Sequence, residues 1–204
     1  NTDKYIIKGK SLNEIQNWCI SKGHSKFRGQ QIFEWIYRHG ETNPDQMTNL
    51  SPGVIKNIKN ECITQTLEIE KVSSSNNENT KKLLFKTLDD KFIETVSMIE
   101  DGRHTVCISS QIGCNVDCDF CATASMGIIR NLKTGEIVDQ LNYIRNNIET
   151  PISNIVFMGM GEPFLNYTRV IKAAKIFHHH RGFGLGAYRI TISTSGILPK
   201  INQF

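Results

Sequence analysis

The sequence contains no apolar run that approaches the roughly 20 residues needed to cross a bilayer, so no membrane association is expected. Its first eight residues lack the long apolar core of a secretory signal, which favours a cytoplasmic location. No Met opens the chain and no closing signal precedes its end at Phe204, so we expect both ends to be cut from a longer protein. No internal repeat is evident. The composition, 39% apolar and 22% charged residues in 204, is that of an ordinary globular protein with a core of its own.

The net charge of +4 is small, but it is concentrated at the amino end of the chain. The first 60 residues hold nine Lys and Arg against five acidic residues, a difference of +4, and the remainder carries 15 of each sign. A basic segment is compatible with a polyanionic partner such as nucleic acid. Charge alone fits a solvated helical face equally well, so both interpretations stay open at this point.

The first part of the chain, residues 1–62, is predicted to be a small helical unit. Ser11 and Glu14 form a capping-box pattern, which marks the start of a helix. A second helix is predicted over 28–38, and prolines and glycines separate further short segments.

The pattern then changes from helical to extended. Residues 63–103 alternate in polarity and include a predicted hairpin of strands 81–88 and 92–99, which indicates a short antiparallel region. From residue 104 onward, predicted strands and helices alternate, as in right-handed βαβ units on a parallel sheet. The expected fold class is therefore α/β, with residues 104–204 forming the first half of a (β/α) barrel that they do not complete.

Three cysteines stand close together in the pattern C-x3-C-x2-C: Cys114, Cys118 and Cys121. A disulfide framework is disfavoured, because the sequence shows no secretory context and one thiol would be left over. A structural zinc site would need a fourth ligand, for which Cys107 or His104 is available. An iron–sulfur cluster held by three thiolates leaves one iron open to an exogenous ligand. The spacing favours iron–sulfur, and zinc remains the alternative.

A glycine-rich loop and a hydroxyl-rich segment follow the next two predicted strands. Residues 158–163 read Met-Gly-Met-Gly-Glu-Pro after a predicted strand over 152–158. Glycines let a backbone approach a ligand closely, and Glu162 offers an acceptor for an ammonium group. The ends of such strands are where ligand sites are built. The segment 190–196 ends another strand, and its hydroxyls could bind polar groups or simply cap the next helix.

Together these segments resemble radical S-adenosylmethionine (SAM) enzymes, and most closely the RlmN/Cfr family of RNA methyltransferases. The cysteine loop follows a first strand, as in that superfamily, and Phe120 matches an aromatic residue common before the last cysteine. Pro163 after Gly161 and Glu162 favours the RlmN side of the family. The matching segments are the cysteine loop and residues 106–114, 157–166, 182–185 and 191–196.

The resemblance implies a set of site residues. The three cysteines of the loop would bind a [4Fe-4S] cluster, and Gly161, Glu162 and Ser193 would bind SAM. Two catalytic residues are also implied: Cys107, which helps resolve a covalent adduct, and Glu94, which accepts a proton. Without the resemblance, Cys107 would be taken as a buried strand cysteine and Glu94 as a solvated strand residue.

The resemblance further implies an activity and partners. Family members methylate carbon 2 of adenosine in 23S rRNA and tRNA through a methyl-cysteine intermediate, with an electron donor such as flavodoxin. Their methyl-carrying cysteine lies in the carboxyl-terminal part, and neither Cys19 nor Cys62 matches it, so we expect this chain alone to be inactive. The helical unit would help to engage RNA, with phosphate contacts from Lys22, His24, Lys26 and Arg28. Two other functions stay open: a zinc-stabilised RNA-binding module without catalysis, and a radical SAM enzyme acting on a small molecule.

Overall fold

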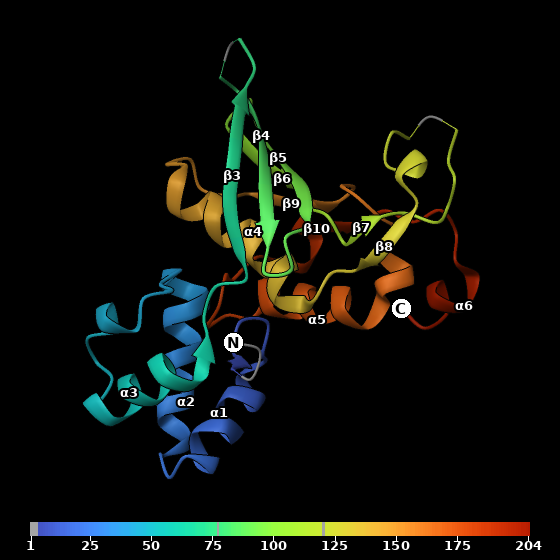
Figure 1. Ribbon diagram of the computed structural model, residues 1–204. Helices are drawn as coiled ribbons and strands as arrows, with labels where there is room; N and C mark the ends of the chain where they lie inside the picture. The colour runs from blue at the N-terminus through green and yellow to red at the C-terminus, as the bar shows by residue number, and fades with distance from the viewer. Residues whose placement is uncertain (1–3, 77, 120) are drawn as a thin grey trace.

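A mixed six-stranded sheet forms the centre of the molecule in the computed structural model, which describes residues 4–76, 78–119 and 121–204. Helices α1 to α3 lie to one side of it, at the lower left of Figure 1. Within those residues, no helix is both long and apolar enough to span a bilayer. In spatial order the strands are β10 (Ile190–Ile192), β9 (Asn154–Phe157), β6 (Arg103–Cys107), β5 (Phe92–Glu100), β4 (Thr80–Thr87) and β3 (Leu67–Ser74).

The carboxyl-terminal half of the sheet is built from parallel βαβ units. Strand β6 pairs in parallel with β9, and β9 pairs in parallel with β10. Helix α4 (Thr134–Asn147) connects the first pair and α5 (Tyr167–His178) the second, and these two helices pack against each other. A short helix, α6 (Leu198–Ile201), follows β10. This arrangement confirms the predicted α/β class and the βα alternation.

The two faces of the sheet differ in burial because successive side chains of a strand point to opposite sides. One face carries Ile93, Val106 and Ile155, which are fully buried in a single core with apolar residues of α4 and α5. The other face carries Glu94, Cys107 and their neighbours, which are only half-buried. The predicted site residues Glu94 and Cys107 therefore lie on the less buried face of the sheet.

The amino-terminal unit consists of short helices closed by a two-residue parallel pairing of β1 (Tyr5–Ile6) with β2 (Cys62–Ile63). The predicted capping box at the first helix is present, with Ser11 Oγ accepting from the backbone of Glu14 and the Glu14 carboxylate accepting from the backbone of Ser11. The helices are α1 (Leu12–Ser21), α2 (Lys26–Glu34), which continues as a π-helical turn over Trp35–His39, and α3 (Pro52–Glu61).

Two features of the sheet were not foreseen. The antiparallel strands β3, β4 and β5 do not form a sheet of their own, because β5 pairs with β6 and so extends the parallel half. The predicted strand over 105–110 ends at Cys107, and a separate ribbon of β7 (Gln111–Gly113) and β8 (Ile128–Asn131) follows it. The proposed domain boundaries at 62 and 103 remain predictions, and the sheet runs continuously across the second of them.

Candidate functional site

The cysteine loop leaves and re-enters the fold through the β7–β8 ribbon. Gly113, the last residue of β7, has φ +74° and lies so close to Gly127 that a Cβ atom would collide with the Gly127 carbonyl. That carbonyl accepts a hydrogen bond from the backbone of Cys114 at 3.1 Å. The two glycines thus close the neck of the loop, and Cys114 follows directly from it.

Six of the eight predicted site residues line one cavity of about 350 Å³. The loop contributes its cysteines, the segment after β9 contributes the glycine-rich turn, and the segment after β10 contributes hydroxyl groups. Residues more than 70 positions apart therefore line one cavity at the carboxyl ends of three strands, where parallel sheets form their ligand sites. The six residues are Cys114, Cys118, Cys121, Gly161, Glu162 and Ser193.

Gly161 and Glu162 are held in place by their surroundings. Gly161 has φ +97°, and an added Cβ would collide with the side chain of Gln111, so only glycine fits. Glu162 is 5% exposed, and its carboxylate accepts three hydrogen bonds, from Phe164 N at 2.8 Å, Thr194 Oγ1 at 2.8 Å and Ser195 N at 2.7 Å. It therefore ties the loop after β9 to the loop after β10. Since a carboxylate offers about four lone-pair positions, one stays available to a ligand.

The three thiols fit the donor set of an iron–sulfur cluster. Cys114 is buried and Cys118 and Cys121 are half-buried, and all three border the same cavity as Glu162. Thiolates are the ligands that such clusters use, and three of them would leave one iron of a four-iron cluster without a protein ligand. Among the described residues, no group of three or more His, Cys, Asp or Glu side chains is gathered closely enough to hold an ion. The loop would therefore have to bring the three thiols closer together when it binds a cluster.

The alternative fourth zinc ligand, His104, is engaged elsewhere. It is fully buried, with Nε2 2.8 Å from Ser97 Oγ and Nδ1 2.7 Å from the Thr150 carbonyl. Both ring nitrogens are thus in hydrogen bonds, so this side chain acts as a satisfied core histidine. The aromatic residue singled out beside the cysteines, Phe120, lies outside the described residues.

The two remaining predicted residues, Glu94 and Cys107, share the open face of the sheet. Cys107 pairs with Val96 across the β5–β6 ladder, and Glu94 lies two residues before Val96 on the same face. Burial raises the pKa of the Cys107 thiol, and a hydrogen bond with the Met158 backbone opposes that rise in part. The Glu94 carboxylate lies 3.0 Å from Lys82 Nζ, and both side chains are about half exposed.

Several buried polar residues around the cavity were missed from the sequence. Gln111 is 3% exposed; its Oε1 accepts from Glu162 N and its Nε2 donates to Asn131 Oδ1, both at 2.7 Å. Asn166 donates to the carbonyls of Ser110 and Leu132, at 2.8 and 2.9 Å. These amides connect the cysteine ribbon to the glycine-rich loop. Their sequence signal, a single amide beside an apolar run, is too common to have marked them.

Comparisons with known proteins match both halves of the chain. Residues 7–63 match the "Ribosomal RNA large subunit methyltransferase N-terminal domain", and residues 108–203 match the "Radical SAM superfamily". Two relatives from Staphylococcus aureus, strains JH9 and Newman, are each described as "Probable dual-specificity RNA methyltransferase RlmN". Each is 40% identical over 207 residues, which cover 100% of this chain and 57% of the relative.

A solved structure agrees with these matches. The crystal structure of a radical SAM methyltransferase from Sphaerobacter thermophilus is 38% identical, with a TM-score of 0.90 over 97% of this chain and 59% of that one. The chain thus spans somewhat more than half the length of the relatives it matches. The first match covers the helical unit, and the second covers the unit that carries the cysteine loop. The chain belongs to the RlmN/Cfr-type radical SAM RNA methyltransferase family, on the RlmN side.

Proposed function

We propose that the protein of which this chain forms part methylates carbon 2 of adenosine in 23S rRNA and tRNA by radical SAM chemistry. The observation that carries the proposal is the single cavity shared by the three loop cysteines, the glycine-rich turn and Ser193. The relatives described as dual-specificity RNA methyltransferases support the choice of substrate class. Family membership supports an enzyme over a zinc-stabilised RNA-binding module, and the engagement of His104 supports the same choice.

The proposed cofactors are a [4Fe-4S] cluster and SAM. Cys114, Cys118 and Cys121 would hold the cluster, and Gly161, Glu162 and Ser193, which line the same cavity, would hold SAM. When bound, the two groups supply the one-electron chemistry that an unreactive methyl C–H bond requires. An electron donor such as flavodoxin would provide the electron. Glu162 would accept a hydrogen bond from the SAM ammonium group at its remaining lone-pair position.

The residues of the open sheet face would handle protons. Carbon 2 of adenine is not a nucleophile, so its hydrogen must be removed by a base after a methyl group has been attached. We assign that role to Glu94, whose carboxylate is accessible and, within the described part of the chain, forms an ion pair only with the half-exposed Lys82. Cys107 would act on the adduct at the same face; because burial raises the pKa of its thiol, the thiol would have to pass its proton to a base before the sulfur reacts as a thiolate.

The chain does not offer the second cysteine that a methyl-cysteine intermediate needs. Cys19 and Cys62 are buried in the amino-terminal unit, at 0% and 7% exposure, away from the cavity. We therefore propose that the 204-residue chain by itself does not methylate RNA. Transfer of a labelled methyl group from SAM to adenosine by the purified chain would contradict this.

The amino-terminal unit would contact RNA phosphates. Lys22 and Lys26 are exposed, and His24 and Arg28 are half-buried. Such contacts position an RNA without reading its sequence, and they weaken with salt. The double variant Lys22→Glu/Lys26→Glu is expected to lower affinity for a tRNA and for a 23S rRNA fragment. The control Lys71→Glu/Lys91→Glu changes charge on β3 and in the turn before β5 instead. Unchanged RNA affinity in the first variant would favour a radical SAM enzyme acting on a small molecule.

We place the protein in the cytoplasm, where these RNAs are found.

Anaerobic reconstitution with iron and sulfide tests the cluster proposal. The native chain should bind about four iron atoms and show the visible absorption of an iron–sulfur cluster, bleached by a strong reductant. Replacing Cys114, Cys118 or Cys121 individually with Ala should abolish this absorption. Cys107→Ala is the matched control and should keep it. A colourless, air-stable protein with one zinc per chain would refute the proposal and favour the zinc-stabilised module.

A further inference from the structure

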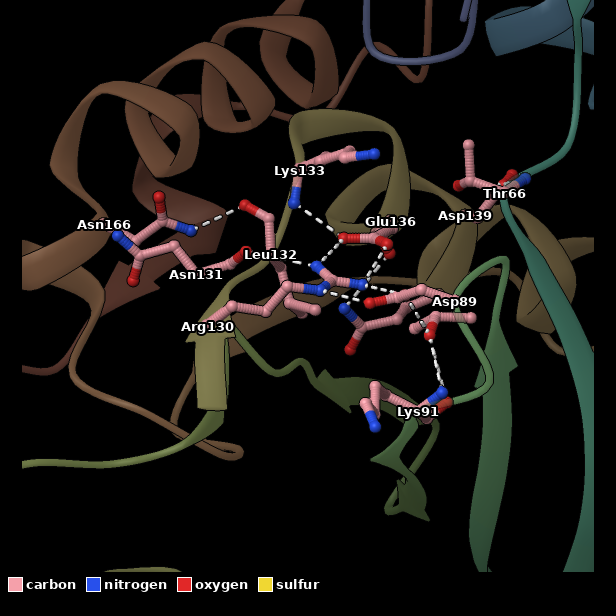
Figure 2. Close-up of polar contacts among 12 residues, drawn as sticks. Thr66, Asp89, Lys91, Arg130, Asn131, Leu132, Lys133, Glu136, Asp139 and Asn166 are labelled. Atoms are coloured by element: carbon pink, nitrogen blue, oxygen red, sulfur yellow. Dashed lines mark hydrogen bonds and ion pairs between the residues drawn. The ribbon is translucent and has the colours of Figure 1, made fainter. Parts of the chain in front are cut away.

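Arg130, on the strand that leaves the cysteine loop, binds two carboxylates at once. Its Nε and Nη2 donate to Asp89 at 2.9 and 2.5 Å, and its Nη1 and Nη2 donate to Glu136 at 2.8 Å each. Nη1 also donates to the Asn131 carbonyl at 3.2 Å. A guanidinium has five N–H groups, so all five are engaged. Figure 2 shows the Arg130 side chain between the two acidic residues.

The two carboxylates belong to different parts of the fold. Asp89 lies in the turn between β4 and β5, and its side chain is half exposed. Glu136 lies in the first turn of α4, with a side chain only 3% exposed. The Glu136 carboxylate also accepts from the backbone of Lys133 at 2.7 Å and lies at the positive end of the helix dipole. Arg130 therefore joins β8 to a hairpin turn and to a helix start.

The cysteine loop has two ends, and they are held differently. Its entry strand, β7, is tied to the glycine-rich loop, because Gln111 accepts from Glu162 N and the Met160 carbonyl accepts from Gln111 N at 3.1 Å. Its exit strand, β8, is only four residues long, and among the described strands it pairs with β7 alone. A two-stranded ribbon is marginally stable without further packing. Asn131 gives β8 further support by accepting from Gln111 Nε2 and donating to the Leu165 carbonyl, and the buried Leu132 that follows bonds to Ser110 and Asn166. Arg130 adds the ion pairs, which alone tie β8 to a hairpin turn and to the start of α4 among the bonds of the described residues.

We propose that Arg130 is a positioning residue that fixes the exit of the cysteine loop, so that the three thiols keep their place on the cavity wall. The inference rests on the proposed function for the meaning of the thiols, but the anchoring itself concerns only the residues of this chain. Asp89 also belongs to the hairpin whose second strand carries Glu94. The same guanidinium thereby fixes the loop relative to the strand of the proposed base.

The anchor depends on the planar fork of arginine and not on its charge alone. An ammonium group cannot engage two carboxylates in paired hydrogen bonds, so Arg130→Lys keeps the charge and loses the geometry. Arg130→Gln would leave the buried Glu136 carboxylate without its counter-charge and could disturb the whole fold. The double variant Arg130→Gln/Glu136→Gln removes that charge and still breaks the anchor. The Arg130 guanidinium also holds the pKa of Asp89 well below its usual range, so the contact persists in mild acid.

Hydrogen exchange of the metal-free chain tests the anchor directly. In Arg130→Lys, amides of the ribbon at 111–113 and 128–131 should exchange about tenfold faster than in the native chain, while those of α5 stay unchanged. The matched control is Arg181→Lys, which alters an arginine paired with Glu34 at 2.7 Å, outside the loop. It should leave ribbon exchange unchanged. If Arg130→Lys does not fold, the double variant Arg130→Gln/Glu136→Gln should show the same faster exchange of the ribbon amides.

A second readout uses the reconstituted protein. Iron release to a chelator should be about tenfold faster in Arg130→Lys than in Arg181→Lys, because a ribbon that opens more often exposes the thiols more often. Unchanged ribbon exchange in a folded Arg130 variant would overturn the inference, whatever the iron does. If the native chain forms no cluster but Arg130→Lys still loosens the ribbon, the proposed function fails and the anchor stands. Iron release and activity are thus separable from the structural claim.

Discussion

The buried ion pair between Lys8 and Asp139 offers the sharpest test of how the amino-terminal unit is held on the α/β part. Lys8 follows β1, is 2% exposed, and places Nζ 2.9 Å from Asp139 Oδ1 on α4. Asp139 Oδ2 accepts from Thr66 N at 2.5 Å and Thr66 Oγ1 at 2.7 Å. Among the residues described, the Lys8 ammonium has no hydrogen-bond partner beyond this ion pair, and the Tyr37 ring lies 5.9 Å away. Removing the carboxylate charge would leave the ammonium alone.

The expected cost of Asp139→Asn follows from that burial. Removing one partner of a buried ion pair costs about 3–5 kcal/mol. The unpaired Lys8 can escape by losing its proton, which costs about 1.4 kcal/mol for each unit between pH 7 and a normal lysine pKa near 10.4. Deprotonation of Lys8 therefore limits the decrease in the free energy of unfolding at pH 7 to about 5 kcal/mol. Burial already lowers the pKa of Lys8 in the native chain, and the attraction of Asp139 opposes this.

The pH dependence has a definite sign. In Asp139→Asn the folded-state pKa of Lys8 lies below its unfolded value, so the folded chain binds fewer protons than the unfolded chain. Stability of the variant therefore rises with pH, and its deficit relative to the native chain should shrink by up to about 1.4 kcal/mol per unit from pH 7 to 9. The surface pair between Lys172 and Glu14, whose side chains are about one-third exposed, provides the control. Lys172→Met should cost about 1 kcal/mol or less, independent of pH in this range.

Urea unfolding followed by tryptophan fluorescence and by circular dichroism measures these losses. Both tryptophans, Trp18 and Trp35, belong to the amino-terminal unit, so fluorescence reports on that unit and dichroism on the whole chain. Coincident transitions are expected if the ion pair makes the two parts one cooperative structure. A loss for Asp139→Asn below about 1 kcal/mol, or one that does not shrink between pH 7 and 9, would refute the reasoning.

Further predictions concern the cavity and the thiols. Gly161→Ala should destabilise the chain by about 2–4 kcal/mol, because the added Cβ collides with Gln111 and the φ is unfavourable for alanine. In the same urea assay, the control Gly184→Ala should cost only about 1–2 kcal/mol, because Gly184 has φ +71° but open space around it. Burial raises the pKa of Cys19 to about 11 and that of Cys62 to about 12. Because the two thiols lose their protons at lower pH in the unfolded chain, the free energy of unfolding should fall between about pH 9 and 12. The fall should be less steep in a variant with both cysteines replaced by Ala. Alkylation of Cys107, followed by mass spectrometry, should keep accelerating above pH 9, and a plateau below that pH would contradict its raised pKa.

Local sequence patterns predicted much of the secondary structure. The capping box at Ser11, the hairpin around Asp89 and the alternation of strands and helices after residue 104 depend on neighbours within a few positions, and each is present. The C-x3-C-x2-C spacing likewise identified the cysteine loop, because all three thiols lie on one short segment. The resemblance to a family added Glu94 and Cys107, whose roles no local pattern could have suggested. Those roles remain predictions.

The sequence by itself thus determined most of the helical and extended segments, which side chains are candidates for binding metal or SAM, and which family the chain resembles. Only the tertiary structure decided which of them meet. Pairing of β5 with β6 placed Glu94 and Cys107 on one face, and the ends of β9 and β10 brought Glu162 and Ser193 into the same cavity as the cysteines. The anchor of Arg130 to Asp89 and Glu136 joins residues 41 and 6 positions apart. Such contacts are fixed by the packing of whole elements against one another, whose energy is spread over many residues and leaves no pattern in a short stretch of sequence.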